Sequence, residues 1–192
     1  MTARFVMIRH GRTTANADGI LMGRNDAPLL PEALTGAARL GDDLALDVAA
    51  VIYSSPQPRA LDTARRISRG QCPLIPHDDL RERDFGNYNG ARFSDLADDP
   101  DWPRYDVRYD ARPKGGESLR DVEQRLFPCL LALHEALPSR QTLVVVGHST
   151  CWRLVESALR DRRHDPLDEP IPLPLAVLDH PRGALARLRN HC

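Results

Sequence analysis

The sequence predicts an α/β fold of three layers, in which helices cover both faces of a mostly parallel central sheet. Short apolar segments typical of strands alternate along the chain with longer segments that have helical periodicity. The segments at 4–9 and 142–147 are continuously apolar in their centres, which is typical of strands that are buried on both faces of a parallel sheet. Since domains usually have roughly 100 to 200 residues, the 192 residues predict one domain over 1–192.

The predicted strands are short runs of aliphatic side chains at 4–9, 51–53, 74–75 and 142–147. The predicted helices have apolar residues three or four positions apart, and they lie at 35–47, from 56 to at least 67, at 119–137 and at 149–160. Ser55 followed by Pro56 suits an N-cap and a first helical position. Ser118 with Asp121 three residues later resembles a capping box, which predicts where the third helix begins.

Two segments have less regular patterns. Residues 176–179 and 184–188 are predicted to form a hairpin, and 85–115 is predicted to leave the core as a substrate lid. Aromatic and basic residues recur at helical spacing inside this lid segment, at Trp102, Arg104, Tyr105, Arg108, Tyr109 and Arg112. They fit a packed helix, a lid that brings arginine to the substrate, or a surface for single-stranded nucleic acid. Interspersed aspartates cancel the positive charge, which disfavours the last of these.

Composition and charge argue against several classes of function. The longest aliphatic run, Leu143–Val146, is far below the ~20 residues that cross a bilayer, so no membrane partner is expected. The apolar run at 5–8 is too short for a signal peptide core, and a cytoplasmic location is expected. A net charge of −1 gives no general attraction to nucleic acid. Four cysteines without a CxxC pair disfavour a zinc site, and His77-Asp78-Asp79 fits a turn better than a cation site.

Polar residues follow three of the predicted strands. They are the segments 9–11 (Arg-His-Gly), 54–59 (Ser-Ser-Pro-Gln-Pro-Arg) and 147–149 (Gly-His-Ser). Because ligands of open α/β sheets bind beyond the carboxyl ends of the strands, we expect these segments to form one site. Two histidines and two arginines make a poor apolar core, but they suit an anion, since guanidinium groups bind phosphate oxygens with charge-assisted hydrogen bonds.

Five blocks of sequence carry a resemblance to a known family. Residues 9–16, Arg-His-Gly-Arg-Thr-Thr-Ala-Asn, resemble the RHGxTxxN signature of the histidine phosphatase superfamily, which includes phosphoglycerate mutases and small phosphatases such as alpha-ribazole phosphatase. The other four blocks resemble later segments of that family, in the same order, at 54–64, 80–90, 115–118 and 144–153. The resemblance implies a phosphoglycerate mutase-like fold and a metabolite phosphatase of the small-phosphatase branch.

The resemblance also implies a role for each site residue. His10 is the expected nucleophile that becomes phosphorylated, and Glu82 is the expected acid and base, with Asp84 as the alternative. The residues expected to bind the phosphoryl oxygens are Arg9, Asn16, Arg59, His148 and Ser149. Ser54 orients His10 in one interpretation and is a bystander in the other. No metal and no cofactor are expected, because arginine and histidine supply the positive charge.

Some features depart from the family pattern or leave the function open. Ser149 replaces the glycine that usually follows the second histidine, and 29–35 is longer than the usual connection. A phosphoglycerate-mutase-type transferase is the second hypothesis, although the paired-arginine, lysine-containing segment of such mutases is not found. A catalytically inactive phosphate-binding scaffold is the third. The expected partner is a small phosphorylated substrate, which the sequence does not identify, and no oligomeric state is predicted.

Overall fold

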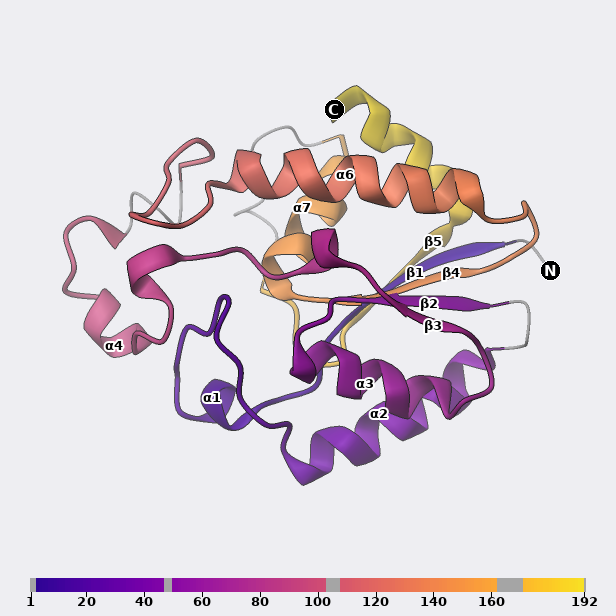
Figure 1. The fold of residues 1–192 in the computed structure, drawn as a ribbon, viewed down its shortest axis with the longest axis horizontal. Helices are drawn as coiled ribbons and strands as arrows, with labels where there is room; N and C mark the ends of the chain where they lie inside the picture. Colours follow the sequence, from indigo (N-terminus) through magenta and orange to yellow (C-terminus); the bar gives the residue numbers. More distant parts are fainter. Residues whose placement is uncertain (1–2, 47–49, 103–107, 162–170, 192) are drawn as a thin grey trace.

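The computed structural model describes residues 3–46, 50–102, 108–161 and 171–191. A five-stranded sheet in the order β3-β2-β4-β1-β5 forms its centre (Figure 1). The strands are β1 (Arg4–Arg9), β2 (Val51–Ser54), β3 (Leu74–Pro76), β4 (Leu143–Gly147) and β5 (Val177–Pro181). The first four run parallel, and β5 pairs antiparallel with β1. The prediction of a mostly parallel sheet is therefore confirmed.

Helices cover both faces of this sheet, which confirms the three-layer prediction (Figure 1). One face carries α2 (Pro31–Leu44) and α3 (Pro58–Ser68), and the other carries α6 (Leu119–Ala136), α7 (Ser149–Leu159) and the 3-10 helix η3 (Arg182–His191). Side chains of β1 alternate between the two faces, so that Val6 joins the α2 and α3 core and Met7 joins the α6 and α7 core. Both are fully buried, and each such side chain contributes roughly 1.5–3 kcal/mol through the hydrophobic effect.

Two helices begin at residues other than the predicted ones. Helix α2 begins at Pro31 rather than at residue 35, because proline fits the first helical position. Helix α3 begins at Pro58 rather than at Pro56, and the Ser55 hydroxyl accepts the Gln57 N–H in a turn before it. Both prolines suit a first turn, so the pattern does not distinguish between them. The predicted capping box of Ser118 is present at the start of α6.

The predicted C-terminal hairpin is wrong. Its first half is β5, which pairs with β1, and its second half lies in the 3-10 helix η3. Leu185 and Leu188 are three residues apart and both fully buried. That spacing places them on one side of a helix with three residues per turn, where they complete the core beside α6 and α7.

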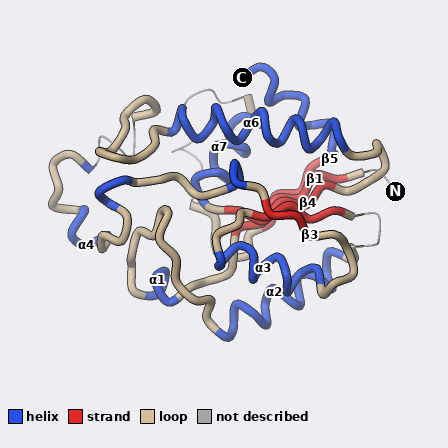
Figure 2. Tube along the Cα trace, in the orientation of Figure 1, coloured by secondary structure: helices blue, strands red, loops and turns tan. Residues whose placement is uncertain are grey.

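Short elements lie beyond the carboxyl ends of the parallel strands. They are α1 (Thr14–Ala17), η1 (Asp78–Leu80), η2 (Gly86–Tyr88) and α4 (Phe93–Leu96), and loops join most of them (Figure 2). Trp102 packs against Phe85 and Tyr88 in a small apolar cluster of its own. The predicted helical spacing of Arg104 and Tyr105 lies outside the described residues. Among the described helices, none combines the length and apolar character needed to span a membrane.

Candidate active site

A cavity of about 680 Å³ lies where the carboxyl ends of β1 and β4 meet. These strands pair so that Arg9 is opposite Gly147, and the His10 N–H donates to the Gly147 carbonyl oxygen over 2.9 Å. This register brings His10 beside His148, with 5.3 Å between their ring centroids. Two segments more than a hundred residues apart in the sequence thus form one site.

Six of the seven predicted site residues line the cavity, and they are Arg9, His10, Asn16, Arg59, Glu82 and Ser149. His148 is the seventh, and it is completely buried next to His10, behind the cavity wall. Glu82 is on the wall, whereas the alternative acid, Asp84, is not among the lining residues. The structure therefore favours Glu82 as the carboxylate of this site.

The hydrogen bonds of His10 determine which of its ring nitrogens carries the proton. Its Nδ1 lies 2.8 Å from the Gly11 carbonyl oxygen, which can only accept, so Nδ1 is protonated. Its Nε2 accepts the Nε–H of Arg59 over 3.3 Å and therefore carries a lone pair. The Ser54 hydroxyl donates to the Ser55 carbonyl instead, so the orienting group is the Gly11 carbonyl rather than Ser54. The residue that the sequence predicts as nucleophile is a neutral, oriented imidazole.

Arg59 is fixed by a loop that precedes α2. Its Nη1 donates to the Asn25 carbonyl over 2.7 Å and to the Asp26 carboxylate over 2.9 Å. Its Nη2 donates to the Gly23 carbonyl over 2.9 Å. With the bond to His10, this guanidinium has four partners, and only 2% of the residue is exposed. One arginine therefore joins the loop to the imidazole.

Gly23 is required by the close approach of two loops. Its φ of +51° lies in the left-handed region, and a Cβ there would lie 1.9 Å from the Asn89 Oδ1. That same oxygen accepts the N–H groups of Arg24 and Phe85. The loop that fixes Arg59 is thus attached to the segment after Glu82, so that both sides of the cavity share one framework.

Three donors fix the orientation of the Glu82 carboxylate. Its Oε1 accepts the Arg83 N–H over 2.8 Å. Its Oε2 accepts the Ser149 hydroxyl over 3.2 Å and the Thr150 N–H over 3.3 Å, at the N-terminus of α7. Ser149 replaces the glycine that the family pattern usually has, and its hydroxyl is hydrogen-bonded to Glu82, the predicted acid.

Unpaired buried groups surround His10. The Nε of Arg9 and both ring nitrogens of His148 are buried without a hydrogen-bond partner among the described residues. Burial, together with the positive charge of Arg59, lowers the pKa of His148 well below its ordinary value, and the same causes act on His10. Because buried polar groups are usually paired, unpaired donors beside two arginines indicate a site that binds an anion.

Comparison with known proteins agrees with this geometry. Residues 5–173 match the sequence profile of the histidine phosphatase superfamily, branch 1. The chain belongs to the histidine phosphatase superfamily. It is 35% identical over 170 residues to the 2,3-bisphosphoglycerate-dependent phosphoglycerate mutase of Rhizobium johnstonii, with 80% of this chain and 77% of that protein covered. The corresponding mutase of Rhizobium etli is 31% identical, with 80% and 78% covered.

Solved structures of superfamily members share the fold. The structure of YhfR from Bacillus stearothermophilus has a TM-score of 0.82 and 27% identity, covering 92% of this chain and 90% of that chain. A mycobacterial glucosyl-3-phosphoglycerate phosphatase has a TM-score of 0.81 at 23% identity, with 93% and 90% covered. The predicted phosphoglycerate mutase-like fold is therefore confirmed.

Two residues of the superfamily blocks have positions that the sequence analysis did not predict. Gln57 is buried, and its side chain donates to the Gly23 carbonyl and accepts the Glu82 N–H. Thr63 is buried in α3 and accepts the Gly11 N–H through its hydroxyl. Both lie inside the block at 54–64, and the available signal was a glutamine just before the helix and a threonine among its buried alanines. They position the loops that carry His10 and Glu82.

The block at 115–118 supports the same loops through Glu117. Its carboxylate accepts hydrogen bonds from Arg24, Arg125 and the Asp84 N–H. Burial alone would raise the pKa of Glu117, but the hydrogen bonds and charge of Arg125 and the other donors hold this pKa below its ordinary value. An ionised Glu117 thus ties α6 to the segment that carries Glu82.

Asn16 already has a structural role in the first block. Its side-chain oxygen accepts the Thr13 N–H, and its own N–H donates to the Thr13 hydroxyl, so the two residues form the capping box of α1. This leaves the side-chain amide N–H groups of Asn16 as the donors for a ligand. The capping box fixes their position at the cavity wall.

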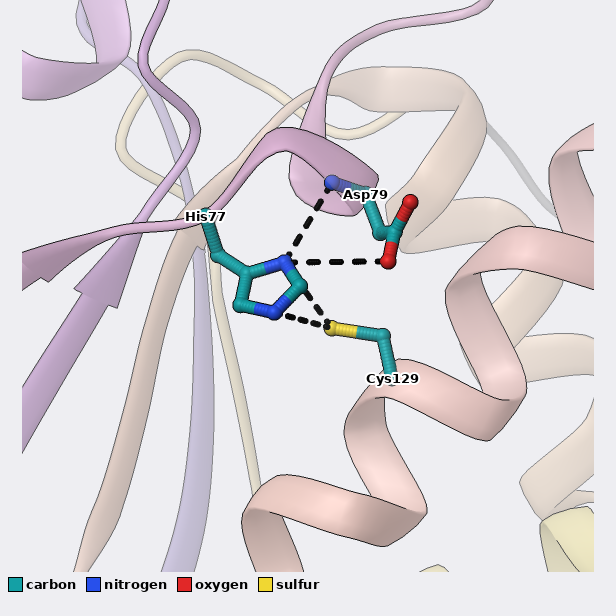
Figure 3. A group of neighbouring side chains, drawn as sticks. All are labelled: His77, Asp79 and Cys129. Carbon is teal, nitrogen blue, oxygen red and sulfur yellow. Dashed lines mark hydrogen bonds and ion pairs between the residues drawn. The ribbon is translucent and has the colours of Figure 1, made fainter.

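A second group of polar side chains lies outside the cavity and consists of His77, Asp79 and Cys129 (Figure 3). The Nδ1 of His77 accepts the Asp79 N–H over 3.3 Å and caps the 3-10 turn η1, as the sequence predicts for this segment. Burial and the Asp79 carboxylate raise the pKa of the Cys129 thiol to about 12, so this thiol is protonated at neutral pH. His77 is therefore the cap of η1, and the Cys129 Sγ lies 3.5 Å from its Nδ1.

The lowered pKa values predict how stability depends on pH. On unfolding, His10 and His148 become free to bind protons near their ordinary pKa of about 6.5. Between pH 7 and pH 5 the unfolded state then binds more protons than the folded state. Each histidine therefore lowers the free energy of unfolding by up to about 1.4 kcal/mol per pH unit as the pH falls.

We expect the free energy of unfolding of His148→Asn, measured in urea, to decrease less between pH 7 and pH 5 than that of the wild type. Equal losses in both proteins would contradict the prediction.

Proposed function

We propose that the protein is a phosphomonoesterase that cleaves a small phosphorylated metabolite through a phosphohistidine and without a metal ion. The observation that supports this most directly is the unprotonated Nε2 of His10 in the cavity that also contains Glu82. A neutral imidazole is a nucleophile, and a covalent intermediate divides one difficult displacement into two easier ones.

In the first step, the His10 Nε2 attacks phosphorus as the ester P–O bond breaks. The proton of the Glu82 carboxylic acid passes to the departing alkoxide, so that the alcohol leaves. In the second step, water attacks the phosphohistidine and its proton passes to the Glu82 carboxylate. The P–N bond then breaks, which releases phosphate and restores both residues.

The charge that gathers on the phosphoryl oxygens requires positive groups around His10. The Arg59 Nε–H, which bonds to His10 at rest, is adjacent to any phosphoryl group at Nε2. The unpaired Arg9 Nε is a further donor for the transferring group, and Asn16 and Ser149 line the same cavity. His148 lies against His10, and its neutral ring has one N–H, which has no partner among the described residues. Preorganised donors of this kind stabilise a transition state strongly, and they supply the charge that metal ions provide in other phosphoryl transfers.

Hydrolysis suits the cavity better than mutase chemistry. A mutase binds a doubly phosphorylated intermediate, so it needs a second group of cations away from the nucleophile. In this chain, the segments at 20–22, 85–102 and 171–174 contribute apolar side chains such as Leu21, Phe93 and Leu173. The further arginines of the cavity, Arg12, Arg83 and Arg153, come instead from the segments that carry His10, Glu82 and Ser149. A phosphoglycerate mutase remains the second candidate because the curated relatives named above carry that name at 31% and 35% identity.

The experiment that tests the proposal measures phosphate release from p-nitrophenyl phosphate in EDTA, across pH 5 to 8. We expect turnover that EDTA does not reduce. Activity that EDTA abolishes would contradict the metal-independent mechanism. Binding of the ester without any phosphate release would instead support the scaffold hypothesis.

A parallel assay separates the two enzymatic candidates. It follows isomerisation of 3-phosphoglycerate after priming with 2,3-bisphosphoglycerate. Release of inorganic phosphate without isomerisation is the expected outcome. Isomerisation that is faster than hydrolysis would favour the mutase.

A smaller effect is expected for Ser149→Ala. The substitution removes one of the three donors to Glu82, while the N–H groups of Arg83 and Thr150 remain. Loss of one such hydrogen bond is worth about 0.5–1.5 kcal/mol, so we expect kcat to fall roughly two- to tenfold. Ser157→Ala is the matched control, because Ser157 is buried in the same helix and is not a lining residue. A larger decrease in the control than in Ser149→Ala would contradict this role.

A further inference from the structure

We infer that the alcohol part of the substrate is apolar, an alkyl or aryl group, which binds against the outer wall of the cavity. The inference rests on the proposed function, because it takes the phosphoryl group to lie at His10. It concerns the part of the cavity that the phosphoryl chemistry does not use. That part is formed by the segments at 20–22, 85–102 and 171–174.

Apolar side chains from all three segments face the cavity. The first segment contributes Leu21 and Met22, the second contributes Phe85 and Phe93, and the third contributes Ile171 and Leu173. Binding pockets for apolar groups have this composition, with a few polar groups at one end that fix the orientation. Here the polar end is the site around His10.

Exposed apolar residues of the described chain are concentrated at this wall. Five large apolar side chains are exposed, and three of them line the cavity: Phe93 at 49%, Ile171 at 62% and Leu173 at 78%. Exposed apolar surface is unfavourable in water, and a contiguous patch of it usually marks a binding surface. A substrate group that covers these side chains would remove that surface from water.

Carboxylate and amide side chains, which bind sugar hydroxyl groups, are lacking on the described part of this wall. Asn16, Ser149 and Thr150 line the cavity from other segments, and the Trp102 indole N–H is the one N–H or O–H side-chain donor among the lining residues of 20–22, 85–102 and 171–174. Glu82 is the one carboxylate among the lining residues, so no acidic side chain is left to bind substrate hydroxyl groups. The outer wall therefore offers a hydroxyl-rich substrate few hydrogen bonds.

Three further arginines, Arg12, Arg83 and Arg153, line the cavity and raise the alternative of a second anionic group. They belong to the segments that form the polar end. Arg12 follows His10 by two residues, Arg83 follows Glu82 directly, and Arg153 lies in the first turns of α7. The apolar wall comes from other segments. A carboxylated substrate such as 3-phosphoglycerate is accordingly the alternative that an experiment must exclude.

The experiment compares kcat/KM for ethyl, butyl and hexyl phosphate with the values for 3-phosphoglycerate and ribose 5-phosphate. A buried methylene contributes about 0.8 kcal/mol, so we expect kcat/KM to rise roughly two- to fourfold per methylene along the alkyl series. Hexyl phosphate is expected to exceed both polar substrates. Equal values along the series, or a preference for 3-phosphoglycerate over hexyl phosphate, would overturn the inference.

A matched pair of variants locates the effect. Ile171→Ala removes an exposed isoleucine from the wall, and Ile75→Ala removes one from β3 that is not a lining residue. We expect Ile171→Ala to lower the hexyl-to-ethyl ratio of kcat/KM about threefold or more, and Ile75→Ala to leave it unchanged. An equal change in both variants would contradict binding at this wall.

Failure of the inference and failure of the proposed function are distinguishable. Turnover of ethyl phosphate with no gain along the series would refute the apolar wall alone, whereas no turnover of any ester would refute the phosphatase. Binding of ethyl- and hexylphosphonate, measured by calorimetry, tests the wall in either case, because phosphonates lack the scissile P–O bond. Equal affinities for ethyl- and hexylphosphonate would refute the binding of an apolar group at the outer wall.

Discussion

Replacing His10 with alanine is expected to reduce kcat for phosphate release by at least about 10⁴-fold. The substitution removes the Nε2 lone pair that the Gly11 carbonyl and Arg59 orient. Without it, no phosphohistidine forms, and the reaction must proceed by direct attack of water. The measurement is turnover of p-nitrophenyl phosphate in EDTA, together with mass spectrometry of the protein after rapid quenching. A phosphorylated protein is expected for the wild type alone.

His180→Ala is the matched control for this prediction. His180 lies in β5 with its Nε2 3.8 Å from the Glu156 carboxylate, and it does not line the cavity. We expect wild-type turnover in this variant. Wild-type turnover in His10→Ala, or a phosphorylated peptide that does not contain His10, would show that the nucleophile is another residue.

Glu82→Gln is expected to have the second largest effect, a decrease in kcat/KM of roughly 10²- to 10⁴-fold for an alkyl phosphate. Glutamine keeps the shape of the side chain but has no proton to give to the alkoxide. The decrease should be smaller for p-nitrophenyl phosphate, because p-nitrophenolate is a stable anion that leaves with little protonation. The ratio of the decrease for the alkyl phosphate to the decrease for p-nitrophenyl phosphate measures acid catalysis by Glu82. We compare kcat/KM because it reports the steps up to phosphorylation of the enzyme, in which the alcohol leaves.

Glu123→Gln controls for the change of a buried carboxylate. Glu123 is 7% exposed in α6 and is not a lining residue, so its replacement should leave the ratio at the wild-type value. If Glu82→Gln lowered kcat/KM equally for the alkyl phosphate and for p-nitrophenyl phosphate, Glu82 would not be the acid, and its role would be structural. Asp84→Asn then tests the alternative carboxylate directly.

The fold was largely predictable because its signals are local. Buried strands such as 143–147 are apolar runs, and helix α6 begins at the capping box of Ser118, both of which can be recognised without tertiary context. The errors arose where a local pattern had two solutions. Pro56 and Pro58 suit a helix start equally, and the apolar residues at 184–188 fit a strand as well as the 3-10 helix that they form.

In the candidate site, the residues that face the ligand were predictable, whereas the partners that hold them in place were not. Residues such as His10 and Arg59 could be proposed because they belong to blocks that follow strands. The partners that fix them could not, because these come from loops distant in the sequence. Asp26 and the Gly23 carbonyl bind Arg59 from more than thirty residues away, and Gln57 contacts both Gly23 and Glu82. Such contacts depend on the final packing of loops, which no local pattern specifies.

The four hydrogen bonds of Arg59 have a consequence for the entropy of ligand binding. An arginine that becomes ordered only when it meets its ligand loses about 1.5–2 kcal/mol of side-chain conformational entropy at that moment. In this protein the guanidinium is already ordered by Gly23, Asn25, Asp26 and His10, so that loss occurs when the chain folds. Binding of a phosphate ester in the cavity therefore costs no side-chain conformational entropy at Arg59.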